Sequence, residues 1–418
     1  MAKIVIIGGG WAGCSAALTA KKTGADVQLI ERTDLLLGLG NVGGIMRNNG
    51  RFTAAEENIA MGAGELFELT DRCAAHSNVD FPGHRHASFY HVIKTEPAVR
   101  RLLTERGVDL QLMTRITDVV KEEDRIKAVM TPDGKIFEGD AFVDCTGTTG
   151  PMGNCMEYGN GCSMCVLRCP AFGPRVSISE RAGGRDYMGK RPDGTPGAFS
   201  GSCKLDKGSL SEELRARLDR DGVVVVPLPE EMVNESKLSK KVCRQYALHQ
   251  YAENIILIDT GAVKMMTPFF PLEQLRQVPG FENARFSDPY AGGKGNSIRY
   301  MAVAEREPSM QVKGVENLFC GGEKSGLFIG HTEAISTGAI AGHNAGRYTR
   351  GGHPLILPET LAIGALLTYE KADGGMITFA GDEFFGYMKE QGLYSTDPAE
   401  IQARVAAAGL ADVYNAFI

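Results

Sequence analysis

The stretch that decides the fold is KIVIIGGGWAG, residues 3–13. Its apolar run from Lys3 to Ile7 predicts a buried strand of a parallel sheet. The alanine-rich run from Cys14 to Thr23 then predicts a helix, and Val27 to Ile30 predicts a second strand that ends at Glu31. A strand, a helix and a strand within about 30 residues form the unit that binds a dinucleotide in many α/β proteins.

The glycines between the first strand and the helix fit the pattern G-x-G-x-x-G. Gly8 permits the tight turn, Gly10 lets the backbone approach a diphosphate, and Gly13 lets the helix pack closely on the strand. The start of the helix offers free N–H groups and a partial positive charge to phosphates. Glu31 is placed to accept hydrogen bonds from the ribose hydroxyls. A glycine-rich turn without a ligand is the alternative interpretation.

Two later segments favour FAD over NAD as the cofactor. Thr146 and Gly147 follow a predicted strand at 141–144, and this turn resembles the Ala-Thr-Gly turn of flavoproteins with two dinucleotide-binding domains. Gly322 and Glu323 follow a second apolar segment that resembles the late strand of such flavoproteins. The helix predicted over 336–347 would direct its N-terminal dipole at negative charge on a reduced flavin. No second G-x-G-x-x-G for NAD(P)H is present in the sequence.

The segment from Gly322 to Arg347 also resembles the signature of the glucose-inhibited-division (GidA) family. That family contains RNA-modifying flavoproteins, including the folate-dependent tRNA uracil-5-methyltransferases, whose later segment is similar to residues 357–369. The resemblance implies a glutathione-reductase-like Rossmann fold that binds FAD. The methyltransferases carry a Cys-Ser-Asn-Ser stretch after their first strand–helix–strand unit, whereas this chain has GNVGGI at 40–45, closer to fumarate-reductase-like oxidoreductases.

A cluster of cysteines is the second motif that indicates a chemical function. Cys155, Cys162, Cys165 and Cys169 are followed by Pro170, and the last three reproduce part of the C-x₂-C-x₂-C-x₃-C-P pattern of bacterial ferredoxins. Thiolates hold iron–sulfur clusters, so the spacing predicts a [4Fe–4S] cluster. Zinc, a redox-active dithiol and ordinary reduced thiols are the alternatives.

Three residues near the predicted flavin ring are candidates for catalysis. His331 is placed to stabilise reduced flavin or to protonate a substrate. Glu333 acts in catalysis or as a helix cap, and Cys320 acts as a redox thiol or packs as a small apolar residue. Lys324 is a candidate for contact with an anion.

Composition limits the partners and the compartment. The chain of 418 residues contains 45 Lys and Arg against 51 Asp and Glu, a formal net charge of −6. This balance gives no general attraction for nucleic acid, so RNA binding is not indicated by charge. We expect a cytoplasmic protein without a membrane segment, acting on a small molecule or with a redox partner protein.

The organisation follows from these motifs. We predict an α/β protein in which residues 1–150 and 311–352 form the FAD-binding domain. Residues 151–310 form an inserted, cysteine-rich α+β substrate domain, and 353–418 form a helical C-terminal segment. Helices are also expected over 53–75, 96–107 and 209–220. The leading hypothesis is an FAD-dependent oxidoreductase; an RNA methyltransferase and an electron-relay subunit are the alternatives.

Overall fold

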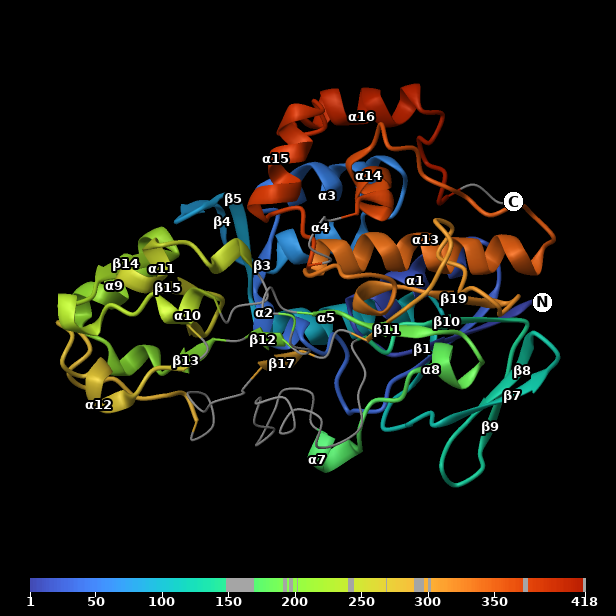
Figure 1. Ribbon diagram of the computed structural model, residues 1–418, viewed down its shortest axis with the longest axis horizontal. Coiled ribbons are helices and arrows are strands. Elements are labelled where there is room, and N and C mark those ends of the chain that lie inside the picture. Colours follow the sequence, from blue (N-terminus) through green and yellow to red (C-terminus); the bar gives the residue numbers. More distant parts are fainter. Residues whose placement is uncertain are drawn as a thin grey trace.

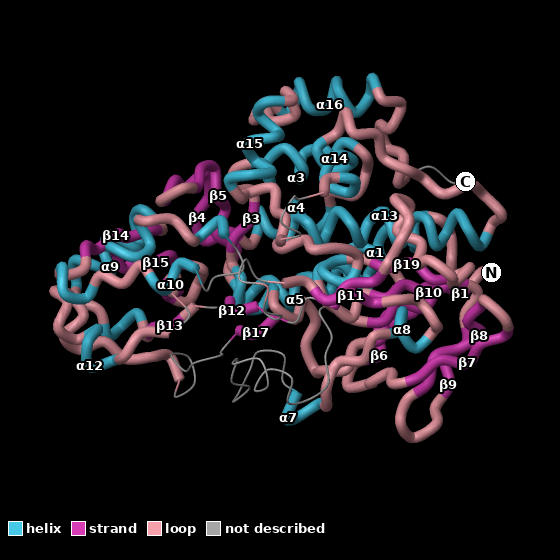
Figure 2. The backbone as a smooth tube through the Cα atoms, viewed as in Figure 1, coloured by secondary structure: helices cyan, strands magenta, loops and turns pink. Residues whose placement is uncertain are grey.

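The computed structural model describes residues 1–147, 169–190, 194, 198–200, 202–239, 244–267, 269–288, 297–299, 302–370 and 375–415. Figure 1 shows a sheet-containing domain, a lobe built from the middle of the chain, and a group of C-terminal helices above the long helix α13 (His331–Thr349). Figure 2 shows that the middle lobe mixes helices and strands, whereas the C-terminal group is helical.

Five parallel strands form the central sheet, in the order β19-β10-β1-β2-β6. Their bounds are β1 Lys3–Ile7, β2 Asp26–Ile30, β6 Asp109–Gln111, β10 Ala141–Asp144 and β19 Leu318–Cys320. The apolar runs read from the sequence therefore become buried strands, because helices and a second layer cover both faces of the sheet. The predicted α/β class with a parallel sheet is confirmed.

Helix α1 (Trp11–Lys22) and helix α13 pack side by side against the sheet (Figure 1). Their close approach depends on small residues: a Cβ at Gly338 would lie 2.2 Å from the Ala12 carbonyl oxygen, and one at Gly342 would lie 2.1 Å from that of Ala16. The Ser15 hydroxyl also donates to the Ile335 carbonyl oxygen at 2.8 Å. The two glycine-rich segments, which lie far apart in the sequence, are thus brought to one edge of the sheet.

The first half of the chain also forms two antiparallel sheets of three strands each. One contains β7 (Asp118–Glu122), β8 (Arg125–Met130) and β9 (Ile136–Glu138). The other contains β3 (Ile45–Met46), β4 (Ala74–Phe81) and β5 (His84–Tyr90). The β4–β5 hairpin was not predicted from the sequence, and its Phe81 and Phe89 pack against the middle lobe.

The middle lobe is formed by residues inserted between β10 and β19, two strands that are neighbours in the central sheet. Its main sheet has the order β13-β16-β15-β14, all antiparallel. The strands are β13 Cys203–Leu205, β14 Val223–Pro227, β15 Asn254–Asp259 and β16 Val263–Met265. Two further pairs are β11 (Asp186–Met188) with β18 (Ala302–Ala304) and β12 (Ala198–Ser200) with β17 (Ser297–Arg299). The helices of the lobe are α9 Glu212–Asp221, α10 Ser236–Ser239, α11 Gln250–Glu253 and α12 Leu272–Leu275. Helices α7 (Cys169–Phe172) and α8 (Ile178–Arg181) lie below the sheet-containing domain instead (Figure 1), and Ile178 packs in its core with Val5 and Phe142.

The predicted helices are present with altered bounds. The stretch 53–75 is two helices, α3 (Gly50–Ala60) and α4 (Glu65–Arg72), because Gly62 has a φ of 89° that interrupts the helix. Helix α5 spans Val92–Glu105. The helix predicted over 209–220 is α9, which begins after Ser211, whose hydroxyl accepts from the Leu214 N–H. Helix α13 begins five residues before the predicted start.

The C-terminal helices are α14 (Ala362–Thr368), α15 (Asp382–Glu390) and α16 (Pro398–Ala407), packed beside α3. The buried Glu57 carboxylate of α3 accepts from the N–H groups of Ala362 at 2.8 Å and Ile363 at 3.0 Å, so it caps α14. Burial raises the pKa of Glu57 to about 7. None of the helices in the described ranges has both the length and the apolar character needed to cross a bilayer.

Candidate functional site

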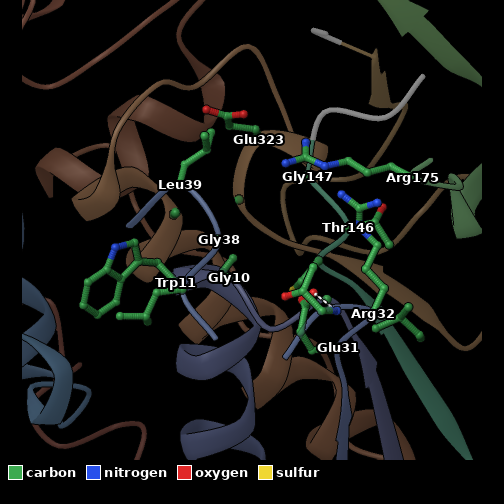
Figure 3. Close-up of a pocket in the computed structure, with 18 of the residues that line it drawn as sticks. Gly10, Trp11, Glu31, Arg32, Gly38, Leu39, Thr146, Gly147, Arg175 and Glu323 are labelled. Carbon is green, nitrogen blue, oxygen red and sulfur yellow. Dashed lines mark hydrogen bonds between the residues drawn. The ribbon is translucent and has the colours of Figure 1, made fainter. Parts of the chain in front are cut away.

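A pocket opens at the carboxyl ends of β1, β2, β10 and β19, where sheets of this kind bind their ligands. It contains about 1290 Å³ of empty space, part of it open to solvent. Figure 3 shows Trp11, Gly38 and Leu39 on one wall, with Arg32, Thr146 and Arg175 on the opposite wall. Seven of the eight residues predicted to bind the cofactor line this pocket: Gly8, Gly10, Glu31, Thr146, Gly147, Gly322 and Glu323.

The glycines of the first turn differ in what surrounds them. Gly8 has a φ of 103°, and a Cβ there would lie 2.3 Å from the Cys145 carbonyl oxygen. Gly13, the eighth predicted residue, lies beneath the pocket, and its Cβ would lie 1.8 Å from the Gly8 carbonyl oxygen. A Cβ at Gly10 would meet no atom within 4 Å, because it would project into the open pocket. The cradle that a diphosphate requires is therefore present at the start of α1.

Glu31 ends β2 and places its carboxylate in the pocket. One oxygen accepts from the Gly9 N–H at 2.7 Å and the other from the Thr33 N–H at 2.8 Å. These two bonds fix the carboxylate, while each oxygen keeps lone pairs for further donors. The geometry fits a partner with two hydroxyl groups, such as a ribose.

Three arginines line the same part of the pocket and were not found by the sequence analysis: Arg32, Arg115 and Arg175. Arg115 is held by a bond from Nε to the Pro174 carbonyl oxygen at 3.0 Å, and Arg32 donates to the Gly173 carbonyl oxygen. They give this end of the pocket positive charge suited to phosphate oxygens. The position of Arg32 directly after Glu31 is a sequence signal from which it could have been found.

The two later turns form the far wall. The Thr146 hydroxyl donates to Asp144 at 2.6 Å, and Gly147 follows with a φ of 71°. Gly322 also has a φ of 71°, and its N–H donates to the Thr337 hydroxyl at 2.8 Å. Both turns therefore require glycine for their backbone conformation, and both are tied to their own strand or helix.

An aromatic group closes the other end of the pocket. His331 is the first residue of α13, and its Nδ1 lies 3.3 Å from the Tyr90 hydroxyl. Burial raises the pKa of Tyr90, so its hydroxyl stays protonated and donates to the Gly40 carbonyl oxygen at 2.6 Å. The Trp11 ring packs edge-on against Tyr90. His331 thus lies at the positive end of a helix dipole, and its imidazole ring is held beside the Tyr90 hydroxyl.

Two segments of the chain match known families. Residues 3–150 match the family described as FAD dependent oxidoreductase, and residues 259–353 match Glucose inhibited division protein A. Two separate parts of the chain are therefore similar to two known families, the FAD-dependent oxidoreductases and GidA. The first segment contains the G-x-G-x-x-G turn, Glu31 and Thr146, and the second contains Gly322, Glu323 and His331. Both matched segments therefore contribute residues to the pocket.

Individual relatives match over part of their length. The methylenetetrahydrofolate–tRNA-(uracil-5-)-methyltransferase TrmFO of Dictyoglomus thermophilum is 31% identical over 175 residues, covering 41% of this chain and 38% of the relative. TrmFO of Moorella thermoacetica is 39% identical over 97 residues, 22% of this chain and 21% of the relative. The tRNA uridine 5-carboxymethylaminomethyl modification enzyme MnmG of Desulfotalea psychrophila is 37% identical over 97 residues, which cover 23% of this chain and 14% of the relative. The chain thus aligns with less than half the length of these relatives.

A solved structure extends the likeness to the whole fold. GidA of Aquifex aeolicus superposes with a TM-score of 0.64 over 97% of this chain and 76% of that chain, at 16% identity. At this identity the likeness concerns the fold alone. It includes the sheet-containing domain and the inserted lobe, in agreement with the predicted GidA-like architecture.

The three residues predicted to be catalytic do not all lie at the pocket. His331 lines the pocket, whereas Glu333 and Cys320 do not. The buried Glu333 carboxylate pairs with Arg51 Nε at 3.1 Å and accepts from the Thr378 hydroxyl and the Phe379 N–H. It therefore joins α3, α13 and the segment before α15.

Cys320 packs on the side of the sheet that faces away from α1, among Val5, Ile7 and Leu318. Burial raises its pKa to about 12, so the thiol is protonated and inert at neutral pH. Lys324 is fully buried and pairs with the Asp186 carboxylate, so its charge is already matched within the protein. The structure gives neither residue access to a ligand in the pocket.

The cysteine cluster falls largely on undescribed residues. Cys155, Cys162 and Cys165 lie outside the described ranges, whereas Cys169 begins α7. Its Sγ lies 3.9 Å from both Nη1 and Nη2 of Arg32. Within the described ranges, no group of three His, Cys, Asp or Glu side chains is arranged to hold a metal ion.

Proposed function

We propose that this chain is an FAD-dependent oxidoreductase that holds FAD in the pocket at the carboxyl ends of the parallel strands. One observation carries the proposal: the glycine turn before α1, the Glu31 carboxylate, the turn at Thr146 and the turn at Gly322 all line a single pocket. Each of these segments is a part of the protein that an FAD molecule needs, and they come from three separate regions of the sequence. The family match supports the same cofactor.

Different residues along the pocket would bind different parts of FAD. The first turn of α1 and the three arginines would bind the diphosphate, and Glu31 would bind the ribose. The start of α13 and His331 would lie at the ring end, where they stabilise negative charge and hold or release a proton. When bound, FAD supplies hydride and single-electron transfer chemistry.

A [4Fe–4S] cluster on Cys155, Cys162, Cys165 and Cys169 is a further part of the proposal. The spacing of the cysteines supports it, and so does the position of Cys169, whose sulfur lies beside the Arg32 guanidinium. A nearby positive charge stabilises a thiolate, which is the form that binds iron. Such a cluster would lie near the Arg32 wall and would relay single electrons to or from the flavin. Zinc on the same thiolates is the alternative.

A second candidate function is FAD- and folate-dependent methylation of uracil in tRNA, with RNA as the partner. The identity to TrmFO proteins favours it. The segment Gly40–Gly43, which stands where the methyltransferases carry Cys-Ser-Asn-Ser, weighs against it. A third candidate, an electron-relay subunit of a larger complex, shares the cofactors but needs no substrate pocket.

One preparation tests these proposals together. Protein purified without oxygen is examined for its visible spectrum, its released flavin, and its iron and sulfide content. We expect one FAD per chain, about four irons, and absorption beyond the flavin bands. Colourless protein that takes up no added FAD would refute the main proposal, and yellow protein without iron would refute the cluster alone. Transfer of a labelled carbon from methylenetetrahydrofolate to tRNA would select the second candidate instead.

A further inference from the structure

The ion pair between Arg51 and Glu333 lies directly behind the wall at the ring end of the pocket. Gly330 lines this wall and immediately precedes His331. A Cβ at Gly330 would lie 1.9 Å from Oε2 of Glu333 and 2.2 Å from Nη2 of Arg51. Arg51 and Glu333 are both buried, and neither lines the pocket. The backbone of a single glycine therefore separates the ion pair from the space proposed for the flavin ring.

The Arg51 guanidinium is fixed by hydrogen bonds to four residues. Its Nε lies 3.1 Å from each carboxylate oxygen of Glu333. Its Nη1 donates to Asn48 Oδ1 at 3.0 Å, and its Nη2 donates to the Thr378 hydroxyl at 2.9 Å. Nη2 also donates to the Ile329 carbonyl oxygen at 3.0 Å. Because the guanidinium is planar and all four partners are buried, its orientation is closely defined.

The last of these bonds orients the peptide group between Ile329 and Gly330. In a trans peptide the C=O and the N–H point in opposite directions, so the Gly330 N–H points away from Arg51. The pocket lies on that side, since Gly330 lines it and Arg51 lies behind Gly330. Among the residues that the structure describes, none accepts a hydrogen bond from this N–H. A donor with a fixed direction is therefore available at the ring end.

We propose that Arg51 is a positioning residue that holds the Gly330 N–H toward the flavin ring, where this N–H stabilises the negative charge of the reduced flavin. The inference rests on the proposed function, because it requires the ring of FAD at this end of the pocket. A donor that is oriented before the charge develops stabilises it without a cost of reorganisation. The positive charge of Arg51 is matched by Glu333, so its influence on the flavin comes through the oriented peptide.

The test measures the two-electron reduction potential of the full chain loaded with FAD, by equilibration with a reference dye. Arg51→Lys keeps a cation beside Glu333, but an ammonium group lacks the planar fork that bonds Glu333 and Ile329 together. We expect the equilibrium constant for flavin reduction to fall about tenfold in this variant, which lowers the potential by about 30 mV.

Matched variants separate orientation from stability. Arg47 is another largely buried arginine that pairs with two carboxylates, those of Glu56 and Asp71, and it does not line the pocket. Arg47→Lys should therefore lower the melting temperature and leave the potential unchanged. Thr378→Val removes one acceptor of Arg51 Nη2 and should lower the potential by a smaller amount. Thr378→Ser keeps the hydroxyl and should retain the original potential.

Each result supports or overturns the inference. An FAD-loaded Arg51→Lys variant that keeps the original potential overturns it, and so does an Arg47→Lys variant with an equal shift. If Arg51→Lys does not fold, an unchanged potential in Thr378→Val overturns it instead. An original protein that binds no FAD refutes the proposed function, and the flavin absorbance distinguishes this failure from the others.

Discussion

Substituting Gly10 by alanine separates cofactor binding from folding. Gly10 has φ −66° and ψ −178°, an extended conformation that alanine adopts without strain. The added methyl group would meet no protein atom within 4 Å. We therefore expect the cofactor-free variant to be at least as stable as the original chain, since a compatible Gly→Ala change adds about 0.4–1 kcal/mol to the free energy of unfolding.

The same methyl group should disturb a bound diphosphate. It projects into the pocket at the first turn of α1, where the backbone must approach the phosphates closely. Inserting a methyl group into a fitted contact costs about 1–3 kcal/mol. Since 1.4 kcal/mol corresponds to a tenfold change in affinity, the dissociation constant for FAD should rise about 5- to 150-fold.

Two further glycines provide the matched controls. In Gly13→Ala the Cβ would lie 1.8 Å from the Gly8 carbonyl oxygen, so this variant should lower the melting temperature of the cofactor-free protein. In Gly386→Ala, within α15, the Cβ meets nothing within 4 Å, so stability should rise slightly and FAD affinity should stay the same. FAD binding is measured by fluorescence titration and stability by thermal unfolding. If Gly10→Ala is stable and still binds FAD as tightly as the original chain, the assignment of the diphosphate site is refuted.

Three other predictions concern the frame around the pocket. Arg51→Met leaves the Glu333 carboxylate buried without its cation, so urea denaturation should show a loss of about 3–5 kcal/mol; a loss below 1 kcal/mol would contradict the structural role of the pair. Gly342→Ala places a Cβ 2.1 Å from the Ala16 carbonyl oxygen, so thermal unfolding should show a loss of at least about 1–3 kcal/mol, and an unchanged melting temperature would argue against the close helix contact. Burial lowers the pKa of His84 to about 3, below the ordinary value of 6.5, so the unfolded chain binds the proton first and stability should fall as the pH drops from 6.5 toward 3. His84→Asn should reduce this slope by up to about 1.4 kcal/mol per pH unit in urea titrations, and parallel profiles for the two proteins would disprove the contribution.

The local parts of the pocket were predictable from the sequence. The first turn and Glu31 lie within one strand–helix–strand unit, where spacing alone determines which residues meet. The start of α13 was placed too late, because Gly330 precedes it without a Ser, Thr, Asp or Asn to act as an N-cap. The earlier start is what brings His331 to the end of the helix.

The remaining contacts depend on tertiary structure. Arg115 and Arg175 reach the pocket from loops whose positions no periodic pattern specifies. Cys320 lies in a three-residue strand that is buried on both faces, so the sequence does not show which face its thiol takes. Glu333 was recognised as a residue of interest, but its partners Arg51 and Thr378 come from segments far away in the chain.

The insertion between β10 and β19 also determines when the pocket is complete. A ribosome makes the strand–helix–strand unit and Glu31 first, but β10 keeps an unpaired edge until Leu318–Cys320 has emerged. The wall at Gly322 and the histidine at the head of α13 follow later still. Nascent chains therefore pass through a long period in which half of the nucleotide cradle exists without its counterpart, and the cradle is complete only after the whole middle lobe has been translated.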